Sequence, residues 1–201
     1  MPEILFVGEG NVCRSVLAER ILRTAVADRW DSDLQISSAG IDARVGEPMD
    51  EMTAEIASSL GVDHTHHEAR TVNSEHLRDA SLVLTGTRKQ RAAVVRLRPA
   101  AVKYTLTIRQ FGHIIEDSLG HPELSAIEEA PFADRLAALL SFVIKRRGRR
   151  LRPDPAVDDV IDPCGQPRHL HETAARQMLP ALNHVALSLG GREVEWVYNR
   201  V

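Results

Sequence analysis

The sequence has few cysteines, few aromatic residues, no long apolar run and no strong net charge. Its two cysteines, Cys13 and Cys164, lie far apart and do not resemble the disulfide framework of a secreted domain, which favours a reducing compartment. No stretch approaches the roughly 18 apolar residues of a membrane span, and residues 1–5 lack the basic start and apolar run of a signal peptide. We therefore expect a soluble, cytoplasmic protein with no membrane partner.

Charge gives no general attraction to nucleic acid, because the net charge is −3 over 201 residues. One local run is strongly basic, and its cations are Lys145, Arg146, Arg147, Arg149, Arg150 and Arg152. This run could grip phosphates or an acidic protein surface, but a solvated helix end, terminated by Gly148, is the favoured interpretation. Aromatic residues make up 4% of the chain and none interleaves with these arginines, so we predict no nucleic-acid partner.

Length and hydrophobic pattern predict a single α/β domain over residues 1–201. Apolar runs that suit buried parallel strands lie at residues 4–7, 34–37, 82–85 and 103–106. Helical patterns lie at about 15–26, 52–60, 88–97, 132–144 and 172–189, and Pro180 is expected to kink or split the last helix. The alternation indicates a parallel sheet covered by helices. Residues 112–155 fit it least well and are expected to form a helical insertion.

The stretch "ILFVGEGNVCRS" runs from a strand through a glycine-containing turn into a helix. Such a turn aims backbone N–H groups and the positive end of a helix dipole at one point, which attracts an oxyanion. A dinucleotide is weakly indicated, since two glycines begin a G-x-G-x-x-G pattern whose third glycine position is Cys13. A phosphate monoester is favoured, because Arg14 can donate two parallel hydrogen bonds to it and Ser15 supplies a hydroxyl at the helix start.

This loop resembles that of the low-molecular-weight protein tyrosine phosphatase family, which has the form C-x-x-x-x-x-R-[ST]. By this resemblance Gly8 falls on the nucleophilic cysteine, Arg14 on the phosphate-binding arginine and Ser15 on the hydroxyl that supports the thiolate. The implied phosphate-binding residues are Glu9, Gly10, Asn11, Val12, Cys13, Arg14 and Ser15. The implied fold is a flavodoxin-like three-layer sandwich, with a four-stranded parallel sheet and helices on both faces.

The resemblance extends along most of the chain. "ISSAG" resembles the family's second strand and implies that Ser38 braces Asn11, while "HEAR" places His67 in a supporting segment. "DVIDPCGQP" resembles the loop that carries the general acid, which implies that role for Asp162; capping of a turn or of the last helix is the alternative. Cys164 stands where the family usually has an aromatic residue, so a deep slot for a phenyl ring has little support.

Gly8 lacks the sulfur that would form the family's cysteinyl-phosphate, so turnover by that route is lost. The leading hypothesis is a pseudophosphatase that binds phosphate, another oxyanion or a phosphorylated protein. Three alternatives stay open. The chain could derive from an active phosphatase whose native cysteine is replaced at position 8, it could be a thiol-dependent enzyme similar to arsenate reductases that uses Cys13 or Cys164, or it could be a scaffold whose partner surface is the 112–155 insertion.

The histidines give little reason to expect a metal. Three of them lie at residues 64–67 in "HTHH", but a site needs a fourth convergent ligand in a defined frame, so we predict no metal and no cofactor. His169 and His171 are expected at the surface of a helix start. The C-terminal segment 192–201 is a candidate strand or homo-oligomer contact.

Overall fold

A computed structural model describes residues 2–27, 34–148 and 154–196. Four strands, β1 (Glu3–Gly8), β2 (Gln35–Gly40), β3 (Leu82–Thr85) and β4 (Thr105–Thr107), form one parallel sheet in the order β2-β1-β3-β4. The predicted four-stranded parallel sheet is thus confirmed, with the second and fourth strands starting one and two residues later than expected.

Two expectations concern residues outside the described ranges. These residues are Arg149, Arg150 and Arg152 of the basic run and residues 197–201 of the C-terminal segment. Residues 192–196 of that segment are described and form no strand.

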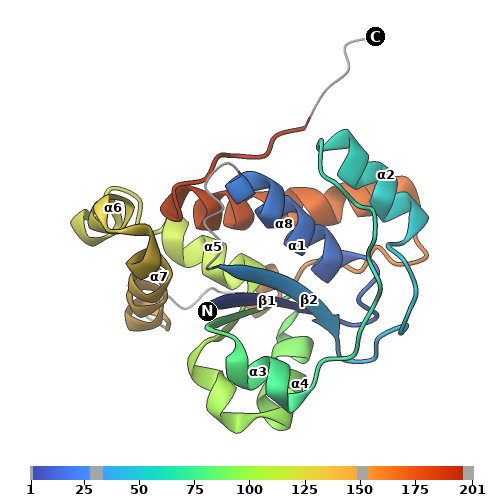
Figure 1. The fold of residues 1–201 in the computed structure, drawn as a ribbon, viewed down its shortest axis with the longest axis horizontal. Coiled ribbons are helices and arrows are strands. Elements are labelled where there is room, and N and C mark those ends of the chain that lie inside the picture. The colour runs from blue at the N-terminus through green and yellow to red at the C-terminus, as the bar shows by residue number, and fades with distance from the viewer. Residues whose placement is uncertain (1, 28–33, 149–153, 197–201) are drawn as a thin grey trace.

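Helices cover both faces of the sheet (Figure 1). Ile4 and Phe6 of β1 point into the larger apolar cluster, whereas Leu5 and Val7 point into the smaller one, as alternation along a strand requires. The larger cluster is covered by α1 (Arg14–Val26), α2 (Glu51–Ser59), α5 (Ile108–Glu116) and α8 (Arg168–Ser188), and the smaller by α3 (Ser74–Asp79), α4 (Arg88–Leu97) and the 3₁₀ turn η2 (Pro99–Lys103). This is the expected three-layer flavodoxin-like arrangement.

The segment predicted as an insertion holds the end of α5, then α6 (Pro122–Glu129) and α7 (Phe132–Arg146), and it ends at the first residue of the 3₁₀ turn η3 (Pro155–Asp158). Leu124 of α6 and Leu139 of α7 are buried in the larger apolar cluster, so these helices extend the same core. Residue Gly148 follows α7 with a φ of 81°, a left-handed conformation that suits glycine after a helix end. The sequence pattern did not predict α3, α5 or α6, which are short and rely on caps such as Asn73 and Thr107.

The described part of the basic run takes part in packing. The Arg146 guanidinium carbon lies 3.6 Å from the ring centroid of Phe142, and its Nη1 lies 3.4 Å from Glu123 Oε2 of α6. Arg147 Nη1 donates to the carbonyl of Val102 at 2.7 Å. These contacts give both arginines partners within the chain.

Pro180 lies inside α8, and the predicted split of that helix is wrong. A proline removes one main-chain hydrogen bond, but Met178 and Leu182 on either side are fully buried and hold the helix in place. Opposite this turn lies Gly112 of α5, where an added Cβ would be 2.7 Å from the Cβ of Ala181. The two helices therefore meet at a contact that leaves no room for a methyl group.

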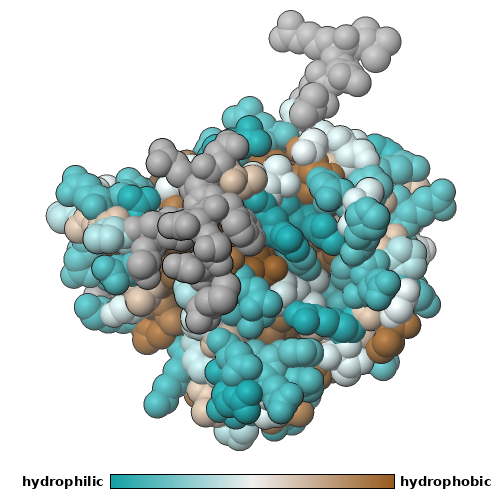
Figure 2. All heavy atoms as spheres, viewed as in Figure 1, coloured by the Kyte–Doolittle hydropathy of each residue, from teal (hydrophilic) through white to brown (hydrophobic). Residues whose placement is uncertain are grey.

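The surface carries mainly polar side chains. On the face drawn in Figure 2, hydrophilic residues predominate and apolar ones gather in small groups. No helix in the described ranges is both long enough and apolar enough to cross a bilayer.

We expect Gly112→Ala to lower the free energy of unfolding by about 1–2 kcal/mol, because overpacking against Ala181 outweighs the gain of about 1 kcal/mol in helix propensity. Urea denaturation of the purified chain measures this change. The double variant Gly112→Ala/Ala181→Gly removes the opposing methyl group. After correction for the helix-propensity cost of the new glycine, its free energy of unfolding is expected to be higher than that of Gly112→Ala. A single variant as stable as the parent would show that α5 and α8 can separate freely.

Candidate oxyanion site

The loop between Gly8 and Arg14 lies at the carboxyl end of β1 and is paired with the chain that follows β2. Backbone N–H groups of Ile41, Asp42 and Arg44 donate to the carbonyls of residues 8, 9 and 10 at 3.0, 3.1 and 3.0 Å. Together with residues 162 and 164 these segments enclose a cavity of about 340 Å³. Its lining is Gly8, Glu9, Gly10, Asn11, Val12, Cys13, Arg14, Ser15, Asp42, Ala43, Arg44, Asp162 and Cys164. All the predicted phosphate-binding residues thus line one pocket beside the N-terminus of α1.

Asn11 joins the loop to its surroundings. Its φ is 58°, and its buried side chain donates from Nδ2 to Ser38 Oγ at 2.9 Å and to Ser15 Oγ at 3.2 Å. Its Oδ1 accepts from the backbone N–H of Arg70 at 2.9 Å, and its carbonyl contacts Nε2 of His67 at 2.7 Å. The side chains predicted as loop support, Ser38 and His67, therefore both contact Asn11.

Glu19 holds the first of these supports, and burial sets the protonation of the second. Ser38 Oγ donates to Glu19 Oε2 of α1 at 2.6 Å, which ties β2 to the first helix. Burial lowers the pKa of His67 below its ordinary value, so the neutral ring, with a proton on Nε2, donates to the Asn11 carbonyl.

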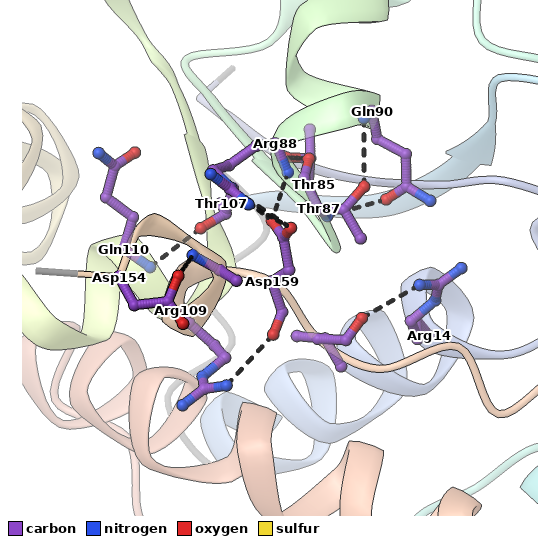
Figure 3. A network of polar contacts seen from close by, with 12 residues as sticks. Arg14, Thr85, Thr87, Arg88, Gln90, Thr107, Arg109, Gln110, Asp154 and Asp159 are labelled. Carbon is purple, nitrogen blue, oxygen red and sulfur yellow. Dashed lines mark hydrogen bonds and ion pairs between the residues drawn. The ribbon is translucent and has the colours of Figure 1, made fainter. Parts of the chain in front are cut away.

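Arg14 is buried, and its guanidinium faces the loop that follows η3. Nη1 donates to the carbonyl of Val160 at 3.2 Å, and Nη2 lies 2.9 Å from Asp162 Oδ2. Figure 3 shows the Arg14 bond beside the network that fixes Asp159, whose carboxylate contacts Arg88 and whose carbonyl accepts from Arg109 at 3.2 Å. The Arg14 guanidinium thus lines the pocket, and one of its edges already binds the Asp162 carboxylate.

Asp162 has two contacts that bear on its predicted role. One oxygen faces Arg14, and the other accepts from the backbone N–H of Cys164 at 3.3 Å, which caps the turn. The side chain is 58% exposed at the cavity edge. The position suits both a proton donor to a bound ester and a turn cap.

Gly8 closes β1 without a side chain in the pocket. A Cβ added there would lie 2.7 Å from Ser15 Oγ and 3.1 Å from Ser15 Cβ. Ser15 therefore partly fills the space of a side chain at position 8. Its hydroxyl accepts from Asn11 and is the nearest polar group to the strand end.

The other loop residues face different neighbours. Glu9 is half-buried and accepts from Gln90 Nε2 of α4 at 3.4 Å, so its carboxylate turns toward α4. Gly10 lies beside the Arg44 side chain, and Val12 is buried in a small cluster with Ala69.

The two thiols meet at the pocket wall. Cys13 Sγ and Cys164 Sγ lie 2.8 Å apart, and both cysteines are free. The hydrogen bond from Cys13, with help from the Arg44 cation, lowers the pKa of Cys164 to about 7. The same bond and burial raise the pKa of Cys13. Cys164 is thus the thiolate of the pair and Cys13 the thiol that donates to it.

Arg44, Asp42 and Ala43 were missed by the sequence analysis, although they lie at the carboxyl end of β2, where α/β sheets bind ligands. The prediction for His171 is wrong: its side chain is 2% exposed and Nδ1 contacts Thr53 Oγ1 at 2.9 Å, because the start of α8 packs against α2. In the described parts of the chain, no group of three or more His, Cys, Asp or Glu side chains could hold a metal ion.

Residues 3–129 match the family model of low molecular weight phosphotyrosine protein phosphatases. The chain belongs to this family. The match includes the loop from Gly8 to Ser15, together with Ser38 and His67, and ends before Asp162 and Cys164.

Two similar proteins are named as phosphatases of the same family. The probable low molecular weight protein-tyrosine-phosphatase AmsI of Erwinia amylovora is 36% identical over 112 residues, which are 56% of this chain and 72% of that protein. The low molecular weight protein-tyrosine-phosphatase Wzb of Salmonella typhi is 34% identical over 111 residues, 55% of this chain and 69% of its own length.

Solved structures share the fold. The crystal structure of the Erwinia amylovora tyrosine phosphatase AmsI superposes with a TM-score of 0.63 at 25% identity, covering 90% of this chain and 89% of that one. The YwlE arginine phosphatase from Geobacillus stearothermophilus has a TM-score of 0.65 at 20% identity and 94% coverage of each chain, a likeness of fold alone.

We expect Asn11→Ala to lower the free energy of unfolding by about 2–4 kcal/mol, because it removes the hydrogen bonds of the buried Asn11 amide and puts alanine at a positive φ. Asn11→Gly loses the same bonds but tolerates the φ, so it is expected to be about 1 kcal/mol less harmful. Chemical denaturation measures both. Equal losses in the two variants would count against backbone strain at this position.

Alkylation tests the thiol pair. Iodoacetamide is expected to modify Cys164 of the folded chain at a rate that rises around a midpoint of about pH 7, since the pKa of that thiol is lowered to about 7. Cys13→Ala removes the donating thiol and is expected to move the midpoint up toward the ordinary thiol value. A midpoint that is unchanged in Cys13→Ala would show that the contact does not set the pKa of Cys164.

Proposed function

We propose that this chain is a pseudophosphatase of its family, which binds phosphate, a related oxyanion or a phosphorylated protein residue without hydrolysing it through position 8. The proposal rests on one observation: the pocket beside the α1 N-terminus keeps a buried Arg14, while the strand end that faces it is Gly8. The proposed ligand is an anion, and the proposal includes no nucleic-acid or membrane partner and no metal or cofactor. A cytoplasmic location belongs to the proposal and is supported by the two free thiols.

Binding is favoured by the same groups that stabilise phosphoryl transfer. The loop N–H groups and the start of α1 carry partial positive charge, and Arg14 adds a full charge in a partly desolvated setting. A glycine at position 8 also removes the negative thiolate that would repel an incoming dianion.

Hydrolysis through position 8 requires a nucleophile that the strand end does not have. Loss of a nucleophile removes many powers of ten in rate, and what stays is binding and charge stabilisation. Ser15 Oγ is the closest hydroxyl, but it is held by Asn11, and among the described residues no general base is hydrogen bonded to it.

Asp162 occupies the part of Arg14 that a bound anion would contact. Its carboxylate is 2.9 Å from the Arg14 edge that an anion would take, so a phosphate must displace it. The displaced carboxyl then lies at the rim of the pocket, where it could hydrogen bond an ester oxygen when protonated.

Restoring the nucleophile tests the proposal. Gly8→Cys is expected to hydrolyse p-nitrophenyl phosphate at least about a thousandfold faster than the parent, since Arg14, Asp162 and the loop residues line the same pocket. Gly8→Ala is the matched control, because it brings the same Cβ close to Ser15 Oγ, 2.7 Å away, without a sulfur. Calorimetry is expected to show phosphate binding to the parent and its loss in Arg14→Ala.

Turnover by the parent chain would contradict the proposal, as would a parent that binds no phosphate. Equal rates for Gly8→Cys and Gly8→Ala would show that the missing sulfur is not what separates this chain from an active phosphatase.

A second candidate function is a thiol-dependent enzyme acting on an oxyanion such as arsenate. It is favoured by the position of Cys164 in the cavity lining and by its lowered pKa. In that case the parent consumes arsenate and one dithiol to give arsenite, a disulfide and water, and Cys164→Ser abolishes the reaction.

A further inference from the structure

Cys13 and Cys164 are 151 positions apart in sequence and adjacent in space. Cys13 precedes the first turn of α1, and Cys164 lies in the turn that follows Asp162. Their sulfurs, 2.8 Å apart, need to approach by less than about 1 Å to reach the length of a disulfide bond.

The pair is chemically unequal. Cys13 is buried and donates its proton, and Cys164, at the cavity lining, carries the thiolate that the Arg44 cation favours. A thiolate reacts with peroxides much faster than a thiol does, so Cys164 is the sulfur that would react first. Cys13 is then in contact with the oxidised sulfur and can resolve it.

The turn that carries Cys164 is anchored on one side and bound to the pocket on the other. Ahead of it, Val160 N–H donates to the Gly86 carbonyl at 2.9 Å and Ile161 N–H to Gln177 Oε1 at 2.9 Å. Beyond this anchor, the contact of Asp162 with Arg14 and the contact of Cys164 with Cys13 join the turn to the pocket.

These two contacts are coupled through the turn. A ligand anion needs the edge of Arg14 that Asp162 occupies, so the turn must yield when the anion binds. With both thiols free, the hydrogen bond between the sulfurs can break. A covalent bond between them would hold Asp162 beside Arg14.

We propose that Cys13 and Cys164 form a redox site that hydroperoxides oxidise to a disulfide, and that this disulfide weakens phosphate binding by keeping Asp162 on Arg14. In the first step the Cys164 thiolate attacks a peroxide oxygen, the O–O bond breaks, and sulfenic acid and hydroxide form. In the second, Cys13 sulfur attacks Cys164 sulfur, the S–O bond breaks, and the hydroxide leaves as water with the Cys13 proton. The two thiols supply the two electrons that reduce the peroxide, and an external dithiol reverses the reaction.

Formation of the disulfide is independent of the proposed function. Its effect on phosphate binding rests on the proposed function. The reduced full chain is treated with one equivalent of hydrogen peroxide, and intact mass, free-thiol titration and peptide mapping follow the products. We expect loss of two hydrogens, a Cys13–Cys164 cross-linked peptide and full recovery with dithiothreitol. Cys13→Ser is expected to stop at a sulfenic acid on Cys164, which dimedone traps, whereas Cys164→Ser reacts far more slowly.

Two outcomes would overturn the redox site: sulfinic acid on both cysteines without a cross-link, or peroxide consumption by Cys164→Ser equal to that of the parent. Folding of each variant is checked by circular dichroism. Each variant replaces a thiol by a smaller hydroxyl that can still donate and accept a hydrogen bond at that position.

Calorimetry with inorganic phosphate tests the gating. We expect the oxidised chain to bind phosphate about tenfold more weakly than the reduced chain, and Asp162→Ala to remove that difference. Equal affinities in a sample shown to hold the disulfide would overturn the gating. Absence of phosphate binding in the reduced chain would overturn the proposed function and the gating with it, while a cross-link in the same sample would still support the redox site.

Discussion

The site depends on one buried amide. Asn11 sits in a left-handed conformation between β1 and α1, and its side chain bonds to β2, to α1 and to the chain near residue 70. Without these bonds the loop's own amides would have no fixed direction, and the helix dipole would point at an undefined place. The position of Arg14, one turn further on, follows from this anchor. The proposed anion recognition at this pocket therefore needs the framework of the loop as well as the Arg14 cation.

Much of this framework was readable from the sequence. A buried apolar run followed by glycines, an Asn and Arg-Ser predicts a strand, a cradle and a helix start, since each element has a strong local signal. The sheet followed in the same way from runs such as residues 82–85. Ser38 and His67 came from a resemblance to a family, and they do contact Asn11. Local pattern and resemblance together thus placed most of the pocket.

Other contacts between distant segments could be read neither from local pattern nor from the resemblance. The pairing of Arg14 with Asp162 depends on how η3 and α8 return to the sheet, and nothing near either residue encodes it. Arg44 enters the pocket because β2 lies beside β1. Pro180 suggested a kinked or split helix, but α8 continues through it, because burial of its neighbours outweighs one lost hydrogen bond. His171 is buried for the same reason: the packing of α8 decides its surroundings.

The meeting of Cys13 and Cys164 also bears on the chain as a polymer. The two residues lie 151 positions apart, so a bond between them would close a loop that contains most of the sheet and nearly all the helices. Such a loop removes conformational freedom from the unfolded chain, which in the chain-entropy account is worth about 5 kcal/mol. A single pair of sulfurs at the pocket wall would then determine how readily the whole molecule unfolds, as well as what its pocket holds.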